Sequence, residues 1–298
     1  MGVTIRTARL ADRARILAIS SQIWEGDDYV PQVIDEWLHM RDSEVVVAEL
    51  NGTVISFAHT VNLASGYVWL EGIRTDTASQ GHGAGKALTE YLIEKAWRDG
   101  AQRIGLSTYI DNLASIHIIE HYGFERQASF IFAEATLDSP ARTCAELSPE
   151  VVAVPFGEAK SWILGSASIA MSCGFVGQGW KFWPASRPGV IAWPAFDKAI
   201  GLRGSNGSLR SLLVVCHPDH GEGEVSIDFA DGSPKDLEVL VRHVLALYPG
   251  AKSIQTVVPA GKGIHTVLLE TLTALEFDVW RHGVPDVFVY ERPVKQPQ

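Results

Sequence analysis

The sequence predicts an α/β protein of the α+β type, with a mixed, mainly antiparallel sheet in its first half and a second, similar domain behind it. Over the first 135 residues the apolar pattern switches between helical spacing and a period of two, in the order β-αα-βββ-α-β-α-β. A comparable order returns from residue 209. The length of 298 residues also exceeds that of a usual single core and favours a division into domains.

The first elements are one strand and two helices. Residues 3–9 alternate between apolar and polar side chains, as a strand does. Residues 10–23 place apolar side chains at helical spacing, and a second helix follows around residues 33–38. The chain therefore enters its sheet through one strand and then leaves it for a helical pair.

A three-stranded antiparallel meander is predicted next. Strands at 44–50 and 53–63 flank Asn51-Gly52, the strongest short signal for a β-hairpin. Residues 67–75 continue as the central strand. A helix over 84–99 then ends at Gly100.

The first half closes with two further strands around a helix. Residues 103–108 and 124–135 have the apolar character of strands, and a helix beginning near Asn112 connects them. A domain boundary is expected near residue 138, where Leu137-Asp138-Ser139-Pro140 interrupts the pattern.

The second half divides into an irregular and a regular part. Residues 139–208 are rich in Pro, Gly and Trp, and we expect Trp162, Trp180, Trp183 and Trp193 to pack against the domains as a connecting segment. Residues 209–298 show strands at 211–217, 224–229, 253–258, 278–280 and 286–291, with helices at 234–247 and 267–275. The predicted domains are therefore 1–138, 139–208 and 209–298.

Composition limits the classes of function. The net charge is −10, with 11 Lys and Arg against 19 Asp and Glu in residues 1–140, and 14 against 16 in the remainder. Nucleic-acid binding needs a basic surface, so the acidic first half disfavours it and favours a cationic or zwitterionic partner such as an amine. Without a run of 18 apolar residues or a signal-peptide pattern, we expect a cytoplasmic protein that neither spans nor binds a membrane.

Metal binding and disulfides are not expected either. Cys144, Cys173 and Cys216 are odd in number and widely separated, which predicts buried, inert thiols. His117 and His121 stand one helical turn apart, but no H-E-x-x-H sequence surrounds them. We therefore expect no metal cofactor.

The most informative motif is the run Gln80-Gly81-His82-Gly83-Ala84-Gly85, which follows an apolar strand and opens a helix. Its glycines let the backbone turn tightly and leave N–H groups uncovered, while the helix N-terminus adds partial positive charge. The run matches neither G-x-G-x-x-G, because Lys86 stands where the last glycine belongs, nor the G-K-[ST] of a P-loop. The alternative is a plain strand-to-helix turn.

With this run in the pattern Q/R-x-x-G-x-G/A, the chain resembles the Gcn5-related N-acetyltransferase (GNAT) superfamily. The segment from Asn112 to Phe124, a helix that begins at Asn and ends in Gly-Phe, resembles that family's second motif. The resemblance implies the GNAT fold and acetyl-CoA as co-substrate. It implies a cofactor site made of Ile73, Thr75, Gln80, Gly81, His82, Gly83, Ala84, Gly85, Lys86, Asn112 and Ser115.

Within the superfamily, residues 24–31 and 70–74 are similar to the histidine N-acetyltransferase group, which also has a long, motif-poor second half. This resemblance implies transfer of acetyl to the amino group of a small molecule, such as the free amino acid histidine. Residues 4–135 carry the likeness, whereas 209–298 share only its layout. We interpret residues 209–298 as a degenerate GNAT-like domain, because 228–234 lack the glycine cradle.

Glu71 is the predicted catalytic base. An amine is protonated at neutral pH and must lose a proton before it attacks a thioester. Glu71 stands on the otherwise apolar central strand, where a carboxylate is costly unless it has a task or a partner. The alternative is a structural carboxylate paired with Arg74 or Arg103.

The acid for the leaving thiolate is open. The superfamily's Tyr stands seven residues after the motif's Asn, and that position is Ile119 here. Tyr29 and Tyr122 are the candidate catalytic hydroxyls; alternatively the thiolate, whose pKa is about 8.5, leaves unassisted.

The acceptor site is expected near Glu25, Asp27, Asp28 and Tyr29, where carboxylates can pair with an ammonium group and Tyr29 can cover it. A solvated acidic loop is the alternative. Other acceptors, namely a peptide, a protein or a cationic antibiotic, and a CoA-binding module without catalysis also remain open, as does a homodimer.

Overall fold

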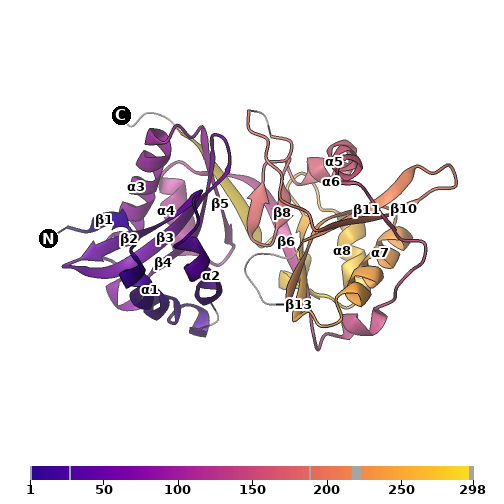
Figure 1. Cartoon of the computed structure of the whole chain (residues 1–298), viewed down its shortest axis with the longest axis horizontal. Helices are drawn as coiled ribbons and strands as arrows, with labels where there is room; N and C mark the ends of the chain where they lie inside the picture. Colours follow the sequence, from indigo (N-terminus) through magenta and orange to yellow (C-terminus); the bar gives the residue numbers. More distant parts are fainter. Residues whose placement is uncertain (1, 27, 188, 217–222, 295–298) are drawn as a thin grey trace. The chain divides into compact units, whose positions relative to one another are not determined.

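A computed structural model describes residues 2–26, 28–187, 189–216 and 223–294. The chain forms two compact units, Met1–Arg126 with Tyr290–Gln298, and Gln127–Val289 (Figure 1). The chain therefore leaves the first unit within one strand and returns to it within another, near its C-terminus.

The first unit is built on a mixed sheet in the order β1-β2-β3-β4-β5-β15. All neighbours from β1 to β4 are antiparallel, and β4 pairs with β5 in parallel. The strands are β1 (Thr4–Thr7), β2 (Ser43–Leu50), β3 (Thr53–Ala64), β4 (Tyr67–Thr75), β5 (Arg103–Tyr109) and β15 (Val287–Pro293).

Helices cover both faces of this sheet (Figure 1). The pair α1 (Arg13–Ser20) and α2 (Val30–Trp37) encloses a core with the alternate β2 residues Val45 and Val47. On the other face, α3 (Ala84–Arg98) packs against β2, β3 and β4, and α4 (Leu113–His121) packs on α3. Burial on both faces explains the almost continuous apolar runs in β2 and β3.

The second unit also has a mixed sheet, in the order β6-β13-β12-β11-β10-β7, in which only β12 and β13 pair in parallel. Helices α7 and α8 pack into its largest core. The strands are β6 (Glu125–Thr136), β7 (Val152–Ala153), β10 (Lys198–Arg203), β11 (Leu209–Cys216), β12 (Glu224–Asp231), β13 (Ser253–Pro259) and β14 (Asp278–Val279), the last on β6. The helices are α5 (Phe156–Gly165), α6 (Ala167–Met171), α7 (Pro234–Leu247) and α8 (Thr266–Ala274), and β8 (Val176–Gln178) and β9 (Lys181–Trp183) form a separate hairpin.

Short 3₁₀ helices complete both units. They are η1 (Leu10–Asp12), η2 (Trp24–Gly26), η3 (Thr77–Ser79), η4 (Pro140–Cys144) and η5 (Trp280–Gly283). The helix expected over 10–23 is therefore shorter, because it is 3₁₀ at its start and ends at Ser20. The last residue of the predicted strand 211–217 lies outside the described residues.

The observed units differ from the expected division into 1–138, 139–208 and 209–298. Most of β6 belongs to the second unit, and the strand that continues the first sheet beyond β5 is β15. Residues 139–208 are also more than a connecting segment, because β7 and β10 extend the second sheet and α5 and α6 pack beside it. Antiparallel pairing joins residues far apart in sequence, and no local pattern reveals it.

The tryptophans of residues 139–208 pack within the second unit. Trp162 and Trp193 lie against a core that includes Phe196, and Trp180 stacks on Phe132 with ring centroids 5.7 Å apart. Of the three cysteines, only Cys216 is buried; Cys144 and Cys173 are partly exposed, so the expected burial holds for one thiol. Among the described residues, no helix is long and apolar enough to cross a membrane.

Candidate active site

The central strands of the first unit separate at one end. Parallel pairing of β4 with β5 runs from Tyr67 opposite Arg103 to Leu70 opposite Leu106. Beyond these pairs, β4 continues to Thr75 and β5 to Tyr109. The backbone edges that face each other past Leu70 are therefore free of the ladder, and Glu71 is the first residue after it.

A β-bulge lies immediately after Glu71. Glu71 pairs with His59 and Arg74 pairs with Phe57, so Gly72 and Ile73 together oppose the single residue between those partners on β3. Two residues three apart on a regular strand point to opposite faces. The extra residue of the bulge places Glu71 and Arg74 on the same face, because His59 and Phe57 share one face of β3.

Glycine is required at the centre of this bulge. Gly72 has a φ of +62°, in the left-handed region that favours glycine. A Cβ atom there would lie 2.7 Å from the Trp37 ring of α2. The bulge and the packing of α2 on the sheet thus depend on the same missing side chain.

Glu71 is held by a buried histidine. The Nδ1 atom of His59 lies 2.8 Å from the Glu71 Oε1 atom, and the two side chains are 1% and 11% exposed. The imidazole stacks on the Trp37 ring with centroids 4.1 Å apart and planes 9° apart. This stacking fixes the orientation of His59 and, through the hydrogen bond, that of the Glu71 carboxylate.

Tyr29 lies beside this pair at the N-cap of α2. Its ring contacts Trp37 edge to face at 6.0 Å, and its hydroxyl would lie 3.7 Å from a Cβ atom on Gly72. Burial raises the pKa of Tyr29, and the negative charge of Glu71 raises it further. Tyr29 therefore stays protonated at neutral pH.

Arg74 is anchored by a buried carboxylate. Its Nε and Nη2 atoms donate to the two carboxylate oxygens of Asp28 at 3.2 and 3.0 Å, and Ser20 Oγ donates to Asp28 at 2.8 Å. The Asp28 side chain is fully buried. Asp28 therefore holds a protein cation, which does not support the expectation that it pairs with a substrate ammonium group.

An aromatic side chain covers Arg74. The Trp24 ring lies over the guanidinium at 4.5 Å, and Trp24 Nε1 donates to the Tyr109 hydroxyl at 3.3 Å. Trp24 thus contacts residues of both separated strands, β4 and β5. It does so from a strained turn: Trp24, Glu25 and Gly26 have φ angles of +46°, +59° and +96°.

The remaining acidic residues of this turn are placed differently. Glu25 is exposed to solvent, which agrees with the alternative of a solvated acidic loop. Asp27 lies outside the described residues. Of the four predicted acceptor-site residues, Asp28 and Tyr29 are therefore those that the fold brings next to Glu71 and Arg74.

The glycine run forms an open turn before α3. Gly81 and Gly83 have φ angles of +84° and +78°, and a Cβ atom on either would meet nothing within 4 Å. The first intrahelical hydrogen bond joins the Ala87 N–H to the Gly83 carbonyl. The N–H groups of Gly83, Ala84, Gly85 and Lys86 precede that bond and have no acceptor within the helix.

The segment before the cradle is anchored to α1 and its neighbours. Asp76 accepts from the Ala78 N–H at 3.1 Å and pairs with Arg15 of α1. The backbone N–H and the hydroxyl of Thr77 both donate to the Gln22 Oε1 atom, at 3.2 and 2.6 Å. The cradle, Gln80 to Lys86, is thus positioned by side chains that sequence reasoning did not single out.

The second predicted motif forms α4. Asn112 is its N-cap, and its Oδ1 atom accepts from the Ser115 N–H at 3.4 Å. Ile119, at the position of the family's Tyr, is buried. Tyr122 ends the helix against His121, and burial, together with the charge of Glu90, raises its pKa. The charge that acts on the Tyr122 hydroxyl is that of Glu90 on α3, not that of Glu71.

Comparisons with known proteins agree with this geometry. Residues 12–124 match the model of the Acetyltransferase (GNAT) family. This part of the chain is therefore an acetyltransferase domain of the GNAT kind, a family that uses acetyl-CoA. The protein is an acetyltransferase, and its own acceptor is a separate question. No curated protein matches the sequence.

Solved structures share the fold over the whole chain. A GCN5-related N-acetyltransferase from Sphaerobacter thermophilus has a TM-score of 0.62 at 13% identity, over 99% of this chain and 96% of its own. A protein from Pyrococcus horikoshii has a TM-score of 0.60 at 14% identity, over 99% and 90%. A GCN5-related N-acetyltransferase from Kribbella flavida has a TM-score of 0.50 at 12% identity, over 98% and 72%.

The described residues fit acetyl-CoA. The open turn of Gly81 and Gly83 offers N–H groups and a helix N-terminus to a pyrophosphate. The separated ends of β4 and β5 expose backbone groups for an extended chain. Thr108 in that part of β5 has a buried hydroxyl with no partner among the described residues, which a ligand in the gap could supply.

Sequence reasoning missed four residues of the site. His59 replaces both partners suggested for Glu71, because Arg74 binds Asp28 and Arg103 lies 3.6 Å from Glu291. Trp24, Trp37 and Tyr109 were also missed as contacts. A polar His within the apolar strand Val54–Val61 was the one available signal, since a buried imidazole needs a hydrogen-bonding partner.

Proposed function

We propose that the first unit transfers acetyl from acetyl-CoA to the amino group of a small molecule, with a free amino acid such as histidine as acceptor. The observation that carries this proposal is the Glu71 carboxylate, held by His59 at the point where β4 and β5 separate. The similarity of residues 24–31 and 70–74 to the histidine N-acetyltransferase group supports the acceptor class.

In this mechanism Glu71 is the general base. The hydrogen bond with His59 orients the Glu71 carboxylate, which accepts a proton from the acceptor's ammonium group. The neutral nitrogen then forms the new C–N bond to the acetyl carbon as the C–S bond of the thioester breaks and CoA leaves as the thiolate. The nitrogen, positively charged after attack, releases its second proton to water and becomes the amide. The proton passes from Glu71 to bulk water when the next substrate enters.

The cradle and the separated strands hold the co-substrate. Acetyl-CoA supplies an activated acetyl group as a thioester. The N–H groups from Gln80 to Lys86 are suited to its pyrophosphate, and the backbone of Ile73 and Thr75 to its extended arm. Asn112, which caps α4 by accepting from the Ser115 N–H, is proposed to contact the pantetheine side of the co-substrate.

The leaving thiolate is proposed to depart without a tyrosine acid. Burial raises the pKa of Tyr29 far above about 8.5, the value for a thiol, so proton transfer from Tyr29 to a thiolate is uphill. Tyr122 also has a raised pKa. Departure of the thiolate without an acid is therefore favoured, and Tyr29 is left to position Gly72 and cover the acceptor.

The second unit is proposed to be a degenerate GNAT-like domain. Its parallel strands β12 and β13 also separate, after Ile227 opposite Thr256, and a bulge follows at Asp228. At the position of the cradle, however, α7 begins with Pro234, and Ser233 caps the Asp236 N–H. Proline has no N–H to offer, so a pyrophosphate site is absent from this described segment.

Turnover tests the proposal directly. CoA release from acetyl-CoA is measured with the twenty amino acids, polyamines, aminoglycosides and short peptides, with mass spectrometry of each product. We expect acetylation of one or a few free amino acids. Higher activity on peptides or aminoglycosides would show that the acceptor is of that class instead of a free amino acid. Acetyl-CoA binding without any turnover would indicate a binding module.

Glu71→Gln tests the base. General-base catalysis contributes about 10²- to 10⁴-fold, so kcat is expected to fall by that factor while acetyl-CoA affinity is retained. Glu44→Gln serves as the matched control, because it removes a carboxylate from β2 that pairs with Lys95. Unchanged turnover and an unchanged rise of turnover with pH in Glu71→Gln would exclude Glu71 as the base.

A further inference from the structure

We propose that Arg74 selects acceptors that carry a carboxylate beside the amine, by binding that carboxylate with the free edge of its guanidinium. This inference rests on the proposed function and names the chemical group that the same site recognises. It predicts α-amino acids, rather than simple amines or polyamines, as the substrate class.

The contacts of Arg74 use only part of its hydrogen-bond donors. A guanidinium has five N–H groups. Asp28 accepts from Nε and Nη2, and the Ile73 carbonyl accepts from Nη1 at 3.2 Å. Among the described residues, these are the only three hydrogen bonds that Arg74 donates. One N–H on Nη1 and one on Nη2 therefore remain for a ligand. A carboxylate with two oxygens matches such a pair of terminal donors.

Neighbouring side chains hold the guanidinium and restrict the directions from which a ligand can reach it. Asp28 occupies the Nε edge, and the Trp24 ring covers one face at 4.5 Å. The Arg74 side chain is 12% exposed. Because Asp28 is itself fully buried and bonded to Ser20, Arg74 cannot swing away without leaving an unpaired buried carboxylate. Arg74 is therefore preorganised rather than a flexible surface cation.

The position of Arg74 relative to the base matches an α-amino acid. The bulge at Gly72 and Ile73 puts Glu71 and Arg74 on one face of β4, and both lie close enough to Tyr29 for their charges to act on its hydroxyl. An α-amino acid carries its ammonium and carboxylate groups on one carbon. Glu71 would meet the ammonium group and Arg74 the carboxylate.

The strained turn from Trp24 to Gly26 is explained by the same role. Two successive residues other than glycine with positive φ are costly and persist where the surroundings hold them. Here the turn brings Trp24 over Arg74 and onto Tyr109. The strain thus contributes to holding a cation whose carboxylate-binding edge stays available.

The test compares each amino acid with its carboxamide, which keeps the amine and removes the negative charge. The wild type is expected to favour the acid in kcat/KM by about 10- to 100-fold, the effect of one charge-assisted hydrogen bond or more. Arg74→Lys keeps a cation for Asp28 but lacks the pair of terminal N–H donors. In this variant the ratio of kcat/KM for the acid to kcat/KM for the carboxamide is expected to fall toward one. The readout is the ratio of the two kcat/KM values within each variant, and the Kd of acetyl-CoA, measured separately, shows whether the co-substrate site is retained.

Arg74→Met provides a second variant of similar size without charge. It is compared after its thermal unfolding shows that it folds; if it does not fold, Arg74→Lys decides. Equal wild-type rates with acids and carboxamides, or an equal loss on both in Arg74→Lys, would overturn the assignment. If the wild type acetylates amines equally well with and without a carboxylate, only the role of Arg74 in acceptor selection is refuted. If it acetylates nothing in the whole panel, the proposed function is refuted.

Discussion

At the scale of single residues, the site depends on one missing side chain. Gly72 permits the bulge that places Glu71 and Arg74 on one face, and it leaves room for the Trp37 ring that orients His59. A backbone requirement and a packing requirement therefore coincide at one position.

Gly72→Ala is expected to impair both folding and turnover. Its φ of +62° strains any other residue, and its Cβ would lie 2.7 Å from Trp37. Strain and overpacking each cost about 1–3 kcal/mol, so the free energy of unfolding should fall by at least that amount in urea titrations. Gly52→Ala is the control, since its φ of +79° is similar but its Cβ meets nothing within 4 Å. An equal loss in both variants would show that the contact with Trp37 is unimportant.

At the scale of elements, the two ends of α3 have different tasks. The helix begins at the cradle with Gly83 as a left-handed N-cap and ends before Gly100, which has a φ of +77°. A Cβ atom meets nothing within 4 Å at either glycine. The two positions are therefore alike in backbone cost but differ in the ligand that is proposed to bind there.

Gly83→Ala is expected to weaken acetyl-CoA binding more than it weakens folding. A methyl group at the turn would cover N–H groups and strain the N-cap, and the loss of one charge-assisted hydrogen bond corresponds to about a 10- to 100-fold rise in Kd. Gly100→Ala serves as the control with the same backbone strain at the far end of α3. Isothermal titration with acetyl-CoA and urea unfolding separate the two effects. Equal acetyl-CoA affinities of Gly83→Ala and Gly100→Ala would contradict the proposal that the cradle binds the pyrophosphate.

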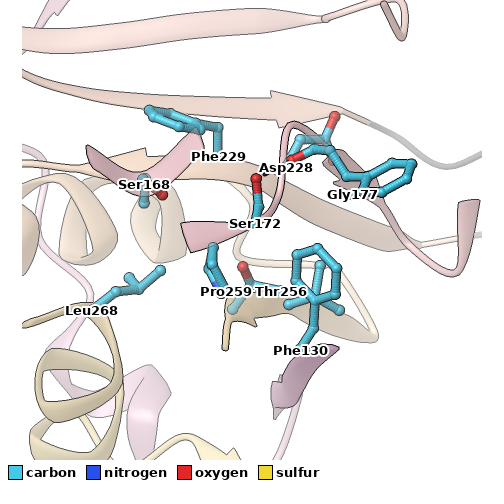
Figure 2. A pocket seen from close by; sticks show the side chains of 12 residues that line it. Phe130, Ser168, Ser172, Gly177, Asp228, Phe229, Thr256, Pro259 and Leu268 are labelled. Atoms are coloured by element: carbon cyan, nitrogen blue, oxygen red, sulfur yellow. Dashed lines mark hydrogen bonds between the residues drawn. The ribbon is translucent and has the colours of Figure 1, made fainter. Parts of the chain in front are cut away.

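At the scale of the whole molecule, the second unit contains a buried acid with no evident part in the proposed reaction. Asp228 lines a cavity with room for about one water molecule, together with Ser172 and Thr256 (Figure 2). Gln178 Nε2 donates to its Oδ2 atom at 3.2 Å, whereas Oδ1 is buried without a partner among the described residues. Burial raises the pKa of Asp228 to about 8.

This shift makes the stability of the molecule depend on pH. An unfolded Asp loses its proton near pH 3.9, whereas folded Asp228 keeps it until about pH 8. Between these values the folded state holds one more proton than the unfolded state, so rising pH lowers the free energy of unfolding, by up to about 1.4 kcal/mol per pH unit. Below pH 4 this contribution is fully present, and above about pH 8 it is lost.

Asp228→Asn is expected to remove that loss. The difference in the free energy of unfolding between the variant and the wild type should grow from pH 5 to pH 8 and then level off, as measured by urea titration at each pH. Asp231→Asn controls for the loss of one negative charge from β12. A difference that does not vary with pH would mean that Asp228 is ionised in the folded protein.

Much of the first unit could be predicted from local patterns. Asn51-Gly52 indicated the hairpin of β2 and β3, and the turn before α3 followed from Gly81 and Gly83. These features depend on neighbours in sequence, because φ angles and helix ends are local properties. The pairing of Glu71 with His59 could not be predicted, since it requires the register of β3 against β4.

Local sequence was enough to indicate a GNAT acetyltransferase domain, because the glycine cradle and the helix that begins at Asn112 are continuous segments within the matched residues 12–124. Which charges pair became visible only once the chain was folded. Asp28 binds Arg74, His59 binds Glu71, and β15 rather than β6 follows β5 in the first sheet. The reason is physical: a buried charge takes whichever partner the fold brings within hydrogen-bonding distance, and that partner can be far away in the chain.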